Sequence, residues 1–381
     1  MITAKRLDTV QEYYFSKKLR EVAELRAQGK PIINLGIGSP DLAPPPQVVE
    51  ALNKALSSNG AHQYQPYKGI AELRNAIAGF YKKFYELDLD SETEILPLMG
   101  SKEGIMHISM TFLNPGDEVL LPNPGYPTYS SVTKLLDAKE RNYELKAEKN
   151  WLPDLKELGD EDLSKVKIMW VNYPHMPTGS IASDEFFSEL TAFAEKHKIL
   201  VVNDNPYSFI QNDTPRSILQ KDNLSDYVME LNSLSKSFNM AGWRVGILAG
   251  SKKNINSVLK VKSNMDSGMF YPVQAGAVEA LKLSGSWFKE QNKVYADRKK
   301  KVLELISELD CEVRKEQVGL FVWAKVPEGK TSEDIVNDLL YNKDIFITPG
   351  FIFGSQGEGY IRFSLCANEE VIEEALKRIK E

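Results

Sequence analysis

Residues 231–246, LNSLSKSFNMAGWRVG, place one lysine, Lys236, among three serines and then an arginine between two glycines. A lysine most often lies on the solvated surface, and serine is a poor former of helices and strands. In a crevice, however, a lysine amine whose pKa is lowered by partial desolvation can form a Schiff base with an aldehyde. Lys236 is therefore the first candidate catalytic residue.

A phosphate-bearing aldehyde would explain the residues around this lysine. Pyridoxal phosphate needs a lysine, a phosphate cradle, a carboxylate on its ring nitrogen, a partner for its phenolic oxygen and an aromatic face. Gly100 and Ser101 open a predicted helix, whose first N–H groups and positive dipole end attract anions. Ser233 can add a hydroxyl and Arg244 a bidentate guanidinium. The GSK segment alone is weak evidence for a phosphate site, because many helices begin in this way.

The segment VVNDNPY supplies the candidate carboxylate, Asp204, at the end of an apolar stretch. The ordinary alternative is that Asp204 caps a helix. Tyr207 follows three residues later, so one turn could offer a carboxylate to the ring nitrogen and a phenol to the phenolic oxygen. An ionised carboxylate keeps the pyridine protonated, and the protonated ring accepts electrons from a substrate that loses its α-proton. Tyr126, in PNPGYPTY, is the candidate aromatic face, although it could equally pack on its proline-rich loop.

Composition limits the kinds of partner and compartment. A formal net charge of −6 leaves no basic surplus for nucleic-acid phosphates, so no nucleic-acid partner is expected. The N-terminal segment has no apolar core typical of a signal peptide, and no run approaches the roughly 20 apolar residues of a membrane span. The two cysteines, Cys311 and Cys366, form no metal-binding or redox spacing, which is typical of a reducing cytoplasm. We therefore expect a cytoplasmic protein without a metal.

The elements that must position these residues alternate between helix and strand from about residue 47. Three short apolar stretches read as strands whose ends turn polar: KIMWVNYP, KILVVNDNPY and YVMELNSL. Apolar strands separated by helices predict a parallel sheet that is covered on both faces. The ligand crevice of such a sheet lies beyond the carboxyl ends of its strands. Asn172, Asp204, Ser233 and Lys236 should therefore converge there.

After about residue 285 the pattern changes to a long charged helix followed by strands and two further helices, which indicates a compact α+β domain with an antiparallel sheet. A chain of 381 residues is also too long for one simple core. We expect an α/β fold in three parts. Residues 1–45 form an N-terminal arm that packs with the small domain. Residues 46–284 form a large cofactor-binding domain with a mostly parallel sheet, and residues 285–381 form the small α+β domain.

Over nearly its whole length the sequence resembles the fold-type I, pyridoxal-phosphate-dependent aminotransferases of class I/II. The matching segments occur in the family's order: NLGIGSPD, YQPYKGIAELRNAI, GSKEGI, PNPGYPTY, NYPHMPTG, DNPY, SLSKSFNMAGWRVG and GYIRFSL. GSKEGI and KSNMDSGMFYPVQ look nearest to the branch that holds alanine and LL-diaminopimelate aminotransferases. The resemblance implies pyridoxal 5′-phosphate as the cofactor and a homodimer with shared active sites.

The resemblance also implies a role for each matching residue. Lys236 would form the internal aldimine and then move the proton between the substrate and cofactor carbons. Asp204 would pair with the ring nitrogen, Tyr207 with the phenolic oxygen, and Tyr126 would stack on the ring.

The remaining roles concern the phosphate and the substrate. Tyr64 would reach the phosphate of the neighbouring subunit. Arg362 would hold the substrate α-carboxylate as a fork, helped by the backbone at Gly38, whereas its ordinary alternative is a salt-bridged surface arginine. The phosphate itself would be held by Ser233, Arg244, Ser101 and the backbone at Gly100 and Lys102.

One position departs from the family pattern. The family's NPTG segment begins with an asparagine that hydrogen-bonds the phenolic oxygen, and here Met176 stands in its place. A thioether cannot donate a hydrogen bond. Tyr207 would then be the only side-chain donor to that oxygen, unless Asn172, His175 or water substitutes. A histidine beside proline is more often packed or exposed than functional. Losing this donor should weaken the anionic form of the cofactor and shift its titration.

These expectations combine into ping-pong transfer of an amino group from an L-amino acid to a 2-oxo acid. A C–S β-lyase or a synthase is the nearest alternative, because the same electron sink serves elimination and the fold does not decide the reaction. A transcriptional sensor on this fold would carry an N-terminal DNA-binding domain, which the acidic charge and the roughly 30 residues before NLGIG disfavour.

The amino donor stays open at this stage. We expect pocket shape to set selectivity, through the N-terminal arm (Tyr13, Tyr14 and Phe15), the KSNMDSGMFYP loop and the GLFVW strand. No certain second arginine marks a site for an acidic side chain. LL-diaminopimelate, alanine, aspartate, methionine and aromatic amino acids all remain candidates.

Overall fold

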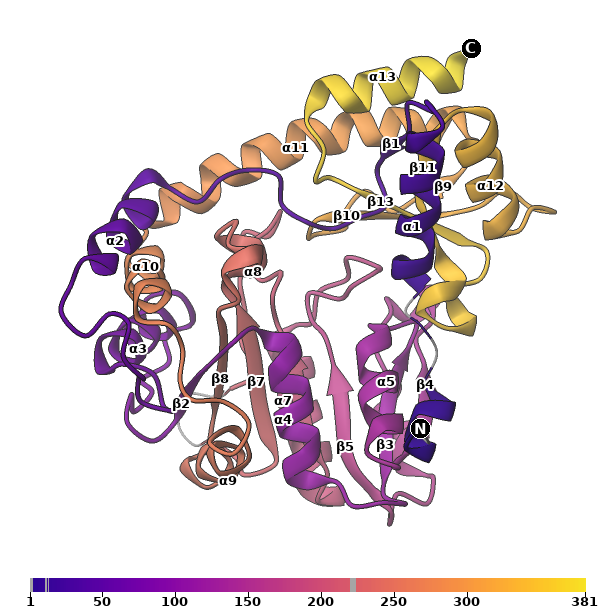
Figure 1. The fold of residues 1–381 in the computed structure, drawn as a ribbon. Helices are drawn as coiled ribbons and strands as arrows, with labels where there is room; N and C mark the ends of the chain where they lie inside the picture. Colours follow the sequence, from indigo (N-terminus) through magenta and orange to yellow (C-terminus); the bar gives the residue numbers. More distant parts are fainter. Residues whose placement is uncertain (1–2, 11, 13, 220–223) are drawn as a thin grey trace.

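The computed structural model describes residues 3–10, 12, 14–219 and 224–381, so Tyr13 lies outside the described residues. A sheet of seven strands forms its centre (Figure 1). In spatial order the strands are β2 (Ile95–Leu98), β8 (Gly246–Gly250), β7 (Val228–Ser233), β6 (Leu200–Asp204), β5 (Val166–Val171), β3 (Glu118–Asn123) and β4 (Lys139–Glu144). All neighbours pair in parallel except β8, which is antiparallel to both β2 and β7. The expected mostly parallel sheet is therefore present.

Both faces of this sheet are covered, which explains why its inner strands are apolar at almost every position. Ile168 and Trp170 of β5 pack in one cluster with side chains of helices on one face, whereas Met169 and Val171 pack in a second cluster on the other face. The first face carries α4 (Ser101–Phe112), α5 (Pro127–Leu135) and α9 (Lys252–Lys262). The second carries α3 (Ala71–Tyr85), α7 (Asp184–His197) and α10 (Tyr271–Leu281), with α2 (Pro46–Leu56) packed on α10.

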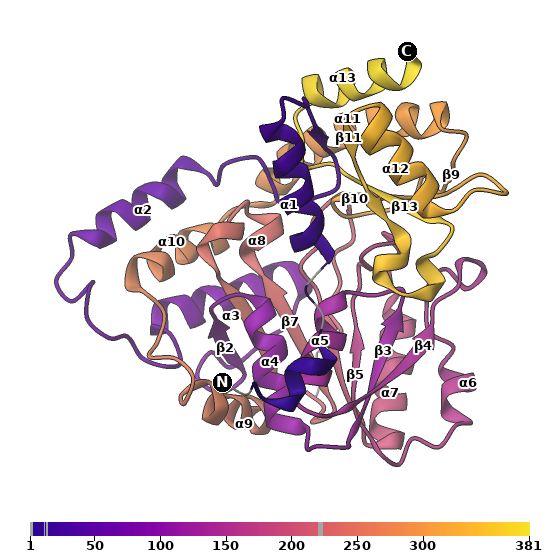
Figure 2. The ribbon, with the colours of Figure 1, turned by 45° about the vertical axis from the view of Figure 1, so that its right-hand side comes forward.

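A second, smaller sheet lies above the carboxyl ends of the central strands (Figures 1 and 2). Its four antiparallel strands are β12 (Thr348–Pro349), β13 (Tyr360–Ser364), β10 (Phe321–Lys325) and β9 (Glu312–Val313), in that order. The long helix α11 (Gly285–Glu308) and the final helix α13 (Glu369–Lys380) lie side by side over it, and α12 (Ser332–Asn342) lies beside it. The antiparallel sheet expected after residue 285 is thus confirmed.

The N-terminal arm joins this smaller sheet region. Its helix α1 is Tyr14–Ala27, and its strand β1 (Ile33–Asn34) pairs in parallel with β11 (Ile345–Phe346). Arg298 of α11 also forms a bidentate ion pair with Asp41 of the arm, at 2.7 and 2.8 Å. The arm is therefore held to the smaller sheet region by backbone hydrogen bonds and by a bidentate ion pair.

Short elements complete the chain. The helix α8 (Leu234–Ser237) follows β7 without a loop and carries Lys236, and α6 (Leu155–Gly159) precedes β5. Among the described residues, five segments are 3-10 helices: Lys5–Thr9, Ala147–Lys149, Ala241–Trp243, Gly350–Phe353 and Ser355–Gly357. Within the described residues, no helix is long and apolar enough to cross a membrane.

Candidate active site

A cavity of about 520 Å³ lies between the carboxyl ends of β5, β6 and β7, the start of β10, strand β13 and the N-terminal arm. Two of the expected site residues, Gly100 and Tyr64, do not line it. The expected residues that do are Gly38, Ser101, Lys102, Tyr126, Asn172, Asp204, Tyr207, Ser233, Lys236, Arg244 and Arg362. Asn172, Asp204, Ser233 and Lys236, which the sheet-edge argument placed together, thus line one cavity.

Lys236 owes its place to the direct join between β7 and α8. Ser233 ends the strand, and its hydroxyl caps the short helix by accepting from Ser235 N. The Lys236 amine donates to the Gly38 carbonyl at 2.6 Å. Burial lowers the pKa of this amine; Cys366 opposes the shift, and the positive charges of Arg362 and Arg244 add to it. A lysine with a lowered pKa is more readily the neutral nucleophile.

Asp204 ends β6 as a buried carboxylate with one oxygen available to the cavity. Its Oδ2 accepts from the Tyr129 hydroxyl at 2.8 Å, while its Oδ1 has no hydrogen-bond partner among the described residues. Burial raises the pKa of Asp204 to about 7, and the Tyr129 hydrogen bond opposes that shift. A cationic N–H group placed at Oδ1 would satisfy this carboxylate.

Tyr129 is a site residue that the sequence reasoning missed. Its ring stacks on Trp170 of β5, with centroids 4.9 Å apart and planes 6° apart, while Tyr126 meets it edge-on at 5.5 Å. Tyr126 and Tyr129 are three residues apart at the start of α5, and that spacing places side chains on one helix face. Both tyrosines are visible in PNPGYPTY, but the role of Tyr129 follows only from its hydrogen bond to Asp204 in the folded protein.

The glycines around Arg244 permit a close approach between two loops. A Cβ on Gly100, which has φ +96°, would lie 2.1 Å from Arg244 Nη2. A Cβ on Gly246 would lie 2.6 Å from the backbone at Gly100 and Ser101. Both positions therefore require glycine for Arg244 to reach the first turn of α4.

The first turn of α4 gathers positive charge. Loss of surrounding water lowers the pKa of the Lys102 amine, and the nearby Arg244 lowers it further. These two cations lie with Ser101, Ser233 and the N-terminal end of a 12-residue helix on one side of the cavity. This arrangement suits a doubly charged phosphate.

Arg362 lies on β13 at the other side of the cavity and is almost fully buried. Its Nη2 donates to the Gly36 carbonyl at 2.8 Å and approaches Thr348 Oγ1 at 3.5 Å. Its Nη1 donates to the Met176 sulfur at 3.3 Å. A thioether is a weak acceptor, so an incoming carboxylate can replace it at Nη1. Arg362 is only 4% exposed, so the alternative of a surface arginine does not hold.

The contacts of the residues near Met176 show which of them could donate a hydrogen bond in place of the family asparagine. Asn172 lines the cavity, but its amide already donates to the Asp204 carbonyl and accepts from Met176 N. His175 does not line the cavity; its Nδ1 contacts Thr178 Oγ1, and burial lowers its pKa to about 3. Tyr207 lines the cavity, and burial raises the pKa of its phenol, which keeps it a donor. His175 is therefore a packed residue.

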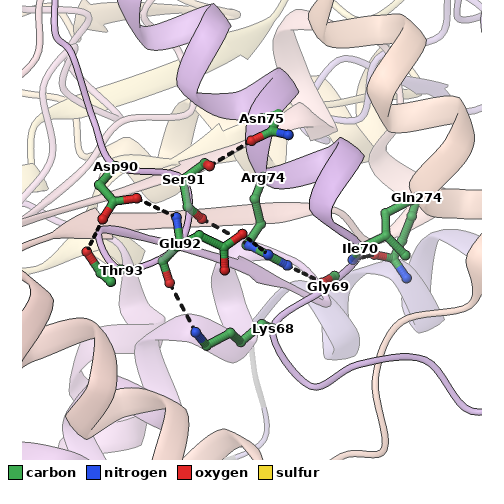
Figure 3. A network of polar contacts seen from close by, with 10 residues as sticks. All are labelled: Lys68, Gly69, Ile70, Arg74, Asn75, Asp90, Ser91, Glu92, Thr93 and Gln274. Carbon is green, nitrogen blue, oxygen red and sulfur yellow. Dashed lines mark hydrogen bonds and ion pairs between the residues drawn. The ribbon is translucent and has the colours of Figure 1, made fainter.

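Tyr64 lies outside the cavity with 90% of its surface exposed. The loop that carries it is anchored at its end by buried polar side chains (Figure 3). Arg74 donates to the Gly69 carbonyl at 2.6 Å, and Gln274 accepts from Ile70 N at 2.8 Å.

These features together fit pyridoxal phosphate. The open Asp204 oxygen suits the protonated ring nitrogen, the cationic turn at Arg244 suits the phosphate, and the Lys236 amine suits the aldehyde. The same site geometry serves several reactions of this cofactor, because the fold does not decide the reaction.

Comparisons with known proteins supply that information. The family model described as aminotransferase class I and II matches residues 30–379. The chain is 39% identical, over all of its length and 98% of the relative, to an LL-diaminopimelate aminotransferase of Dehalococcoides mccartyi. It is 40% identical to one of Maridesulfovibrio salexigens, over 99% of this chain and 98% of the relative.

Solved structures agree with this assignment. Apo-BacF from Bacillus subtilis superposes with a TM-score of 0.95 at 35% identity, over 100% of this chain and 98% of that one. An alanine aminotransferase from Pyrococcus furiosus superposes with a TM-score of 0.90 at 26% identity, over 99% and 98% of the two chains. The chain therefore belongs to the class I and II aminotransferases, and it is a fold-type I, pyridoxal-phosphate-dependent transaminase.

Proposed function

We propose that the 520 Å³ cavity is the site of this transamination and that its lining residues divide the work as follows. The observation that carries the proposal is the placement of the Lys236 amine, the open Asp204 oxygen and the Arg362 guanidinium around one cavity. The amino group passes from an L-amino acid to a 2-oxo acid in two half-reactions.

The bound cofactor supplies an electron-accepting ring that stabilises negative charge at the substrate α-carbon. Asp204 would hold the ring nitrogen protonated through Oδ1, which has no other hydrogen-bond partner among the described residues. Lys236 Nζ would hold the cofactor aldehyde in the resting enzyme; once the substrate's amino group displaces it there, the released amine would take the α-proton as a general base. Tyr207 would donate to the phenolic oxygen, and Arg362 would fix the α-carboxylate so that the α-proton faces Lys236.

The phosphate is proposed to lie at the first turn of α4. Arg244 and Lys102 supply charge, and Ser101 and Ser233 supply hydroxyl groups. The backbone at Gly100 adds N–H donors at the helix end. Tyr126 covers one face of the ring.

A homodimer with shared sites is proposed from the exposed rings of the Tyr64 loop. Tyr64, Tyr67, Met265 and Phe270 are large, apolar and exposed side chains on two adjacent loops. A second copy of the chain would cover them and bring Tyr64 to the partner's phosphate.

We also propose that the domain boundaries lie near residues 45 and 284. The cavity wall combines the arm, the central sheet and the smaller sheet, so a movement of the smaller part would carry Arg362 toward the substrate and exclude water. A cytoplasmic location is proposed because Cys311 and Cys366 are both free thiols.

The names of the two relatives make LL-diaminopimelate, and with it lysine biosynthesis, one candidate for the donor.

The proposed role of Lys236 is tested by covalent trapping. The protein is loaded with pyridoxal phosphate, reduced with borohydride, digested and analysed by mass spectrometry. We expect one added cofactor mass on the peptide that contains Lys236, and none in Lys236→Ala. Lys262, a fully buried lysine, provides the control variant Lys262→Ala, which should still be labelled at Lys236. Labelling at another lysine would contradict the proposal.

A further inference from the structure

Three phenylalanine rings surround the Arg362 guanidinium. Their centroids lie 3.9 Å (Phe321), 4.8 Å (Phe353) and 5.6 Å (Phe15) from its central carbon. The rings come from β10, from the 3-10 helix Gly350–Phe353 and from α1, so three separate parts of the chain converge on this point. All three rings line the cavity.

At least one of these rings is fixed in position. A Cβ on Gly38 would lie 2.1 Å from Phe321 Cζ, so Gly38 and the ring are in close contact. The Tyr207 ring meets Phe321 edge-on, with centroids 6.0 Å apart. On another side of Arg362, the Met176 sulfur lies 3.3 Å from Nη1. Beyond its hydrogen bonds to the Gly36 carbonyl and the Thr348 hydroxyl, the guanidinium is therefore flanked by apolar groups, of which Phe321 is held in place.

The charged residues of the cavity wall already have roles in the proposed function. Lys102 and Arg244 lie together at the first turn of α4, Asp204 is bonded to Tyr129, and Lys236 is bonded to Gly38. Arg362 is the remaining charged group that the described residues contribute to this wall.

A substrate held by its α-carboxylate on Arg362 has its Cβ only two bonds from that carboxylate carbon. Its side chain therefore starts close to the three rings around Arg362. Burying an aliphatic or aromatic side chain there is favourable, and ring pairs add further attraction. A distal ammonium or carboxylate, as in diaminopimelate, would lose its water against these rings without a charged partner from this wall.

We propose that the amino donor of this enzyme carries an uncharged, apolar or aromatic side chain, and that Phe15, Phe321 and Phe353 determine this selectivity. The proposal rests on the proposed function, because it places the α-carboxylate on Arg362. It assigns to this chain a donor class different from the one that its relatives' names contain.

The test uses the intact holoenzyme, so any contribution from a second subunit is included. Single amino acids are added without an acceptor, and the rate at which the visible cofactor band disappears is measured over a range of concentrations. L-Phenylalanine, L-leucine and L-methionine should react with second-order rate constants at least about tenfold above those of LL-diaminopimelate and L-aspartate. A faster reaction with either charged donor would overturn the inference. Failure of every donor would instead contradict the proposed function.

Single-residue variants test whether the rings determine the selectivity for the donor side chain. Phe353→Ala should reduce the rate constant for L-phenylalanine by about tenfold or more, while that for L-alanine, whose methyl group reaches less of the ring, changes little. Phe353→Leu retains apolar volume and replaces Phe353→Ala in this measurement if the alanine variant does not fold. Phe351→Ala is the matched control, because Phe351 belongs to the same 3-10 helix but does not line this cavity. Equal losses for both donors in Phe353→Ala would show that the ring has a structural role only.

Discussion

At the scale of single residues, Asp204 links the chemistry of the site to stability. Burial raises its pKa to about 7, against about 3.9 in an unfolded chain. The folded protein therefore keeps this proton over a pH range in which the unfolded chain has lost it. The stability that this neutral carboxyl retains is full below the unfolded pKa and is lost as the pH rises through 7.

We accordingly predict that the apoprotein loses stability relative to Asp204→Asn as the pH rises from 5 to 8. The change over this pH range should be about 3 kcal/mol, because roughly two units of the pKa shift lie between pH 5 and pH 7 and each corresponds to about 1.4 kcal/mol. Urea unfolding at several pH values measures it, with the exposed Asp213→Asn as control. Bound cofactor should reduce the slope, since its ring nitrogen pairs with the carboxylate. A pH-independent difference would show that Asp204 is ionised throughout.

Met176 gives a second prediction at this scale. Met176→Asn restores a donor beside the phenolic oxygen, so the anionic form of the bound cofactor should be favoured and its spectral titration should move to lower pH. Absorption spectra recorded from pH 5 to 10 measure the midpoint. Met110→Asn, at an exposed position on α4, is the control. An unchanged midpoint would mean that water or Asn172 already satisfies that oxygen.

Residue types at strand ends were enough to predict that Asn172, Asp204, Ser233 and Lys236 lie together, because the carboxyl ends of a parallel sheet meet at one edge. Tyr129 was missed because its use depends on a side-chain contact with Asp204, which no local pattern encodes.

At the scale of elements, the Tyr64 loop depends on Arg74. This buried side chain on α3 donates to the carbonyls of Gly69 and Ser91 and pairs with Glu92 (Figure 3). Lys262 of α9 donates to the Tyr67 carbonyl of the same loop. The loop therefore has little freedom, which would lower the cost of ordering it against a partner.

Arg74→Met is predicted to destabilise the protein by about 2–5 kcal/mol, because it leaves two carbonyls and a carboxylate without their donor. Lys82→Met, at an exposed position on the same helix, should change stability by about 0.5 kcal/mol or less. Urea denaturation measures both variants. Similar stabilities for the two would mean that water replaces the guanidinium.

Sequence patterns predicted the element types better than their pairing. The segment IFITPG reads as one strand, but it divides into β11, which pairs with the arm, and β12, which joins the smaller sheet. The antiparallel β8 was not anticipated, since its apolar residues give no sign of direction. Edge strand β4 was also missed, because its sequence KERNYE is mostly polar and exposed.

At the scale of the whole molecule, the proposed dimer predicts complementation between two defective chains. Tyr64→Ala alone should bind pyridoxal phosphate weakly, and Lys236→Ala alone should be inactive. In a mixed dimer, one site combines Lys236 of the first chain with the partner's Tyr64, and it is intact. Unfolding and refolding an equimolar mixture should therefore restore activity at low cofactor concentration.

The control for this experiment is Tyr64→Ala refolded alone under the same conditions. No recovery in the mixture, or a mass corresponding to a monomer in light scattering, would contradict the shared site.

The central claim is transamination at this cavity, and one measurement tests it most directly. The purified protein, loaded with pyridoxal phosphate, is mixed with a single amino acid in the absence of an acceptor, and the visible cofactor band is followed together with the products. We predict that the band disappears while one equivalent of 2-oxo acid per site is released, and that adding another 2-oxo acid restores the band and yields its amino acid. A band that persists while ammonia accumulates would indicate elimination and contradict the account.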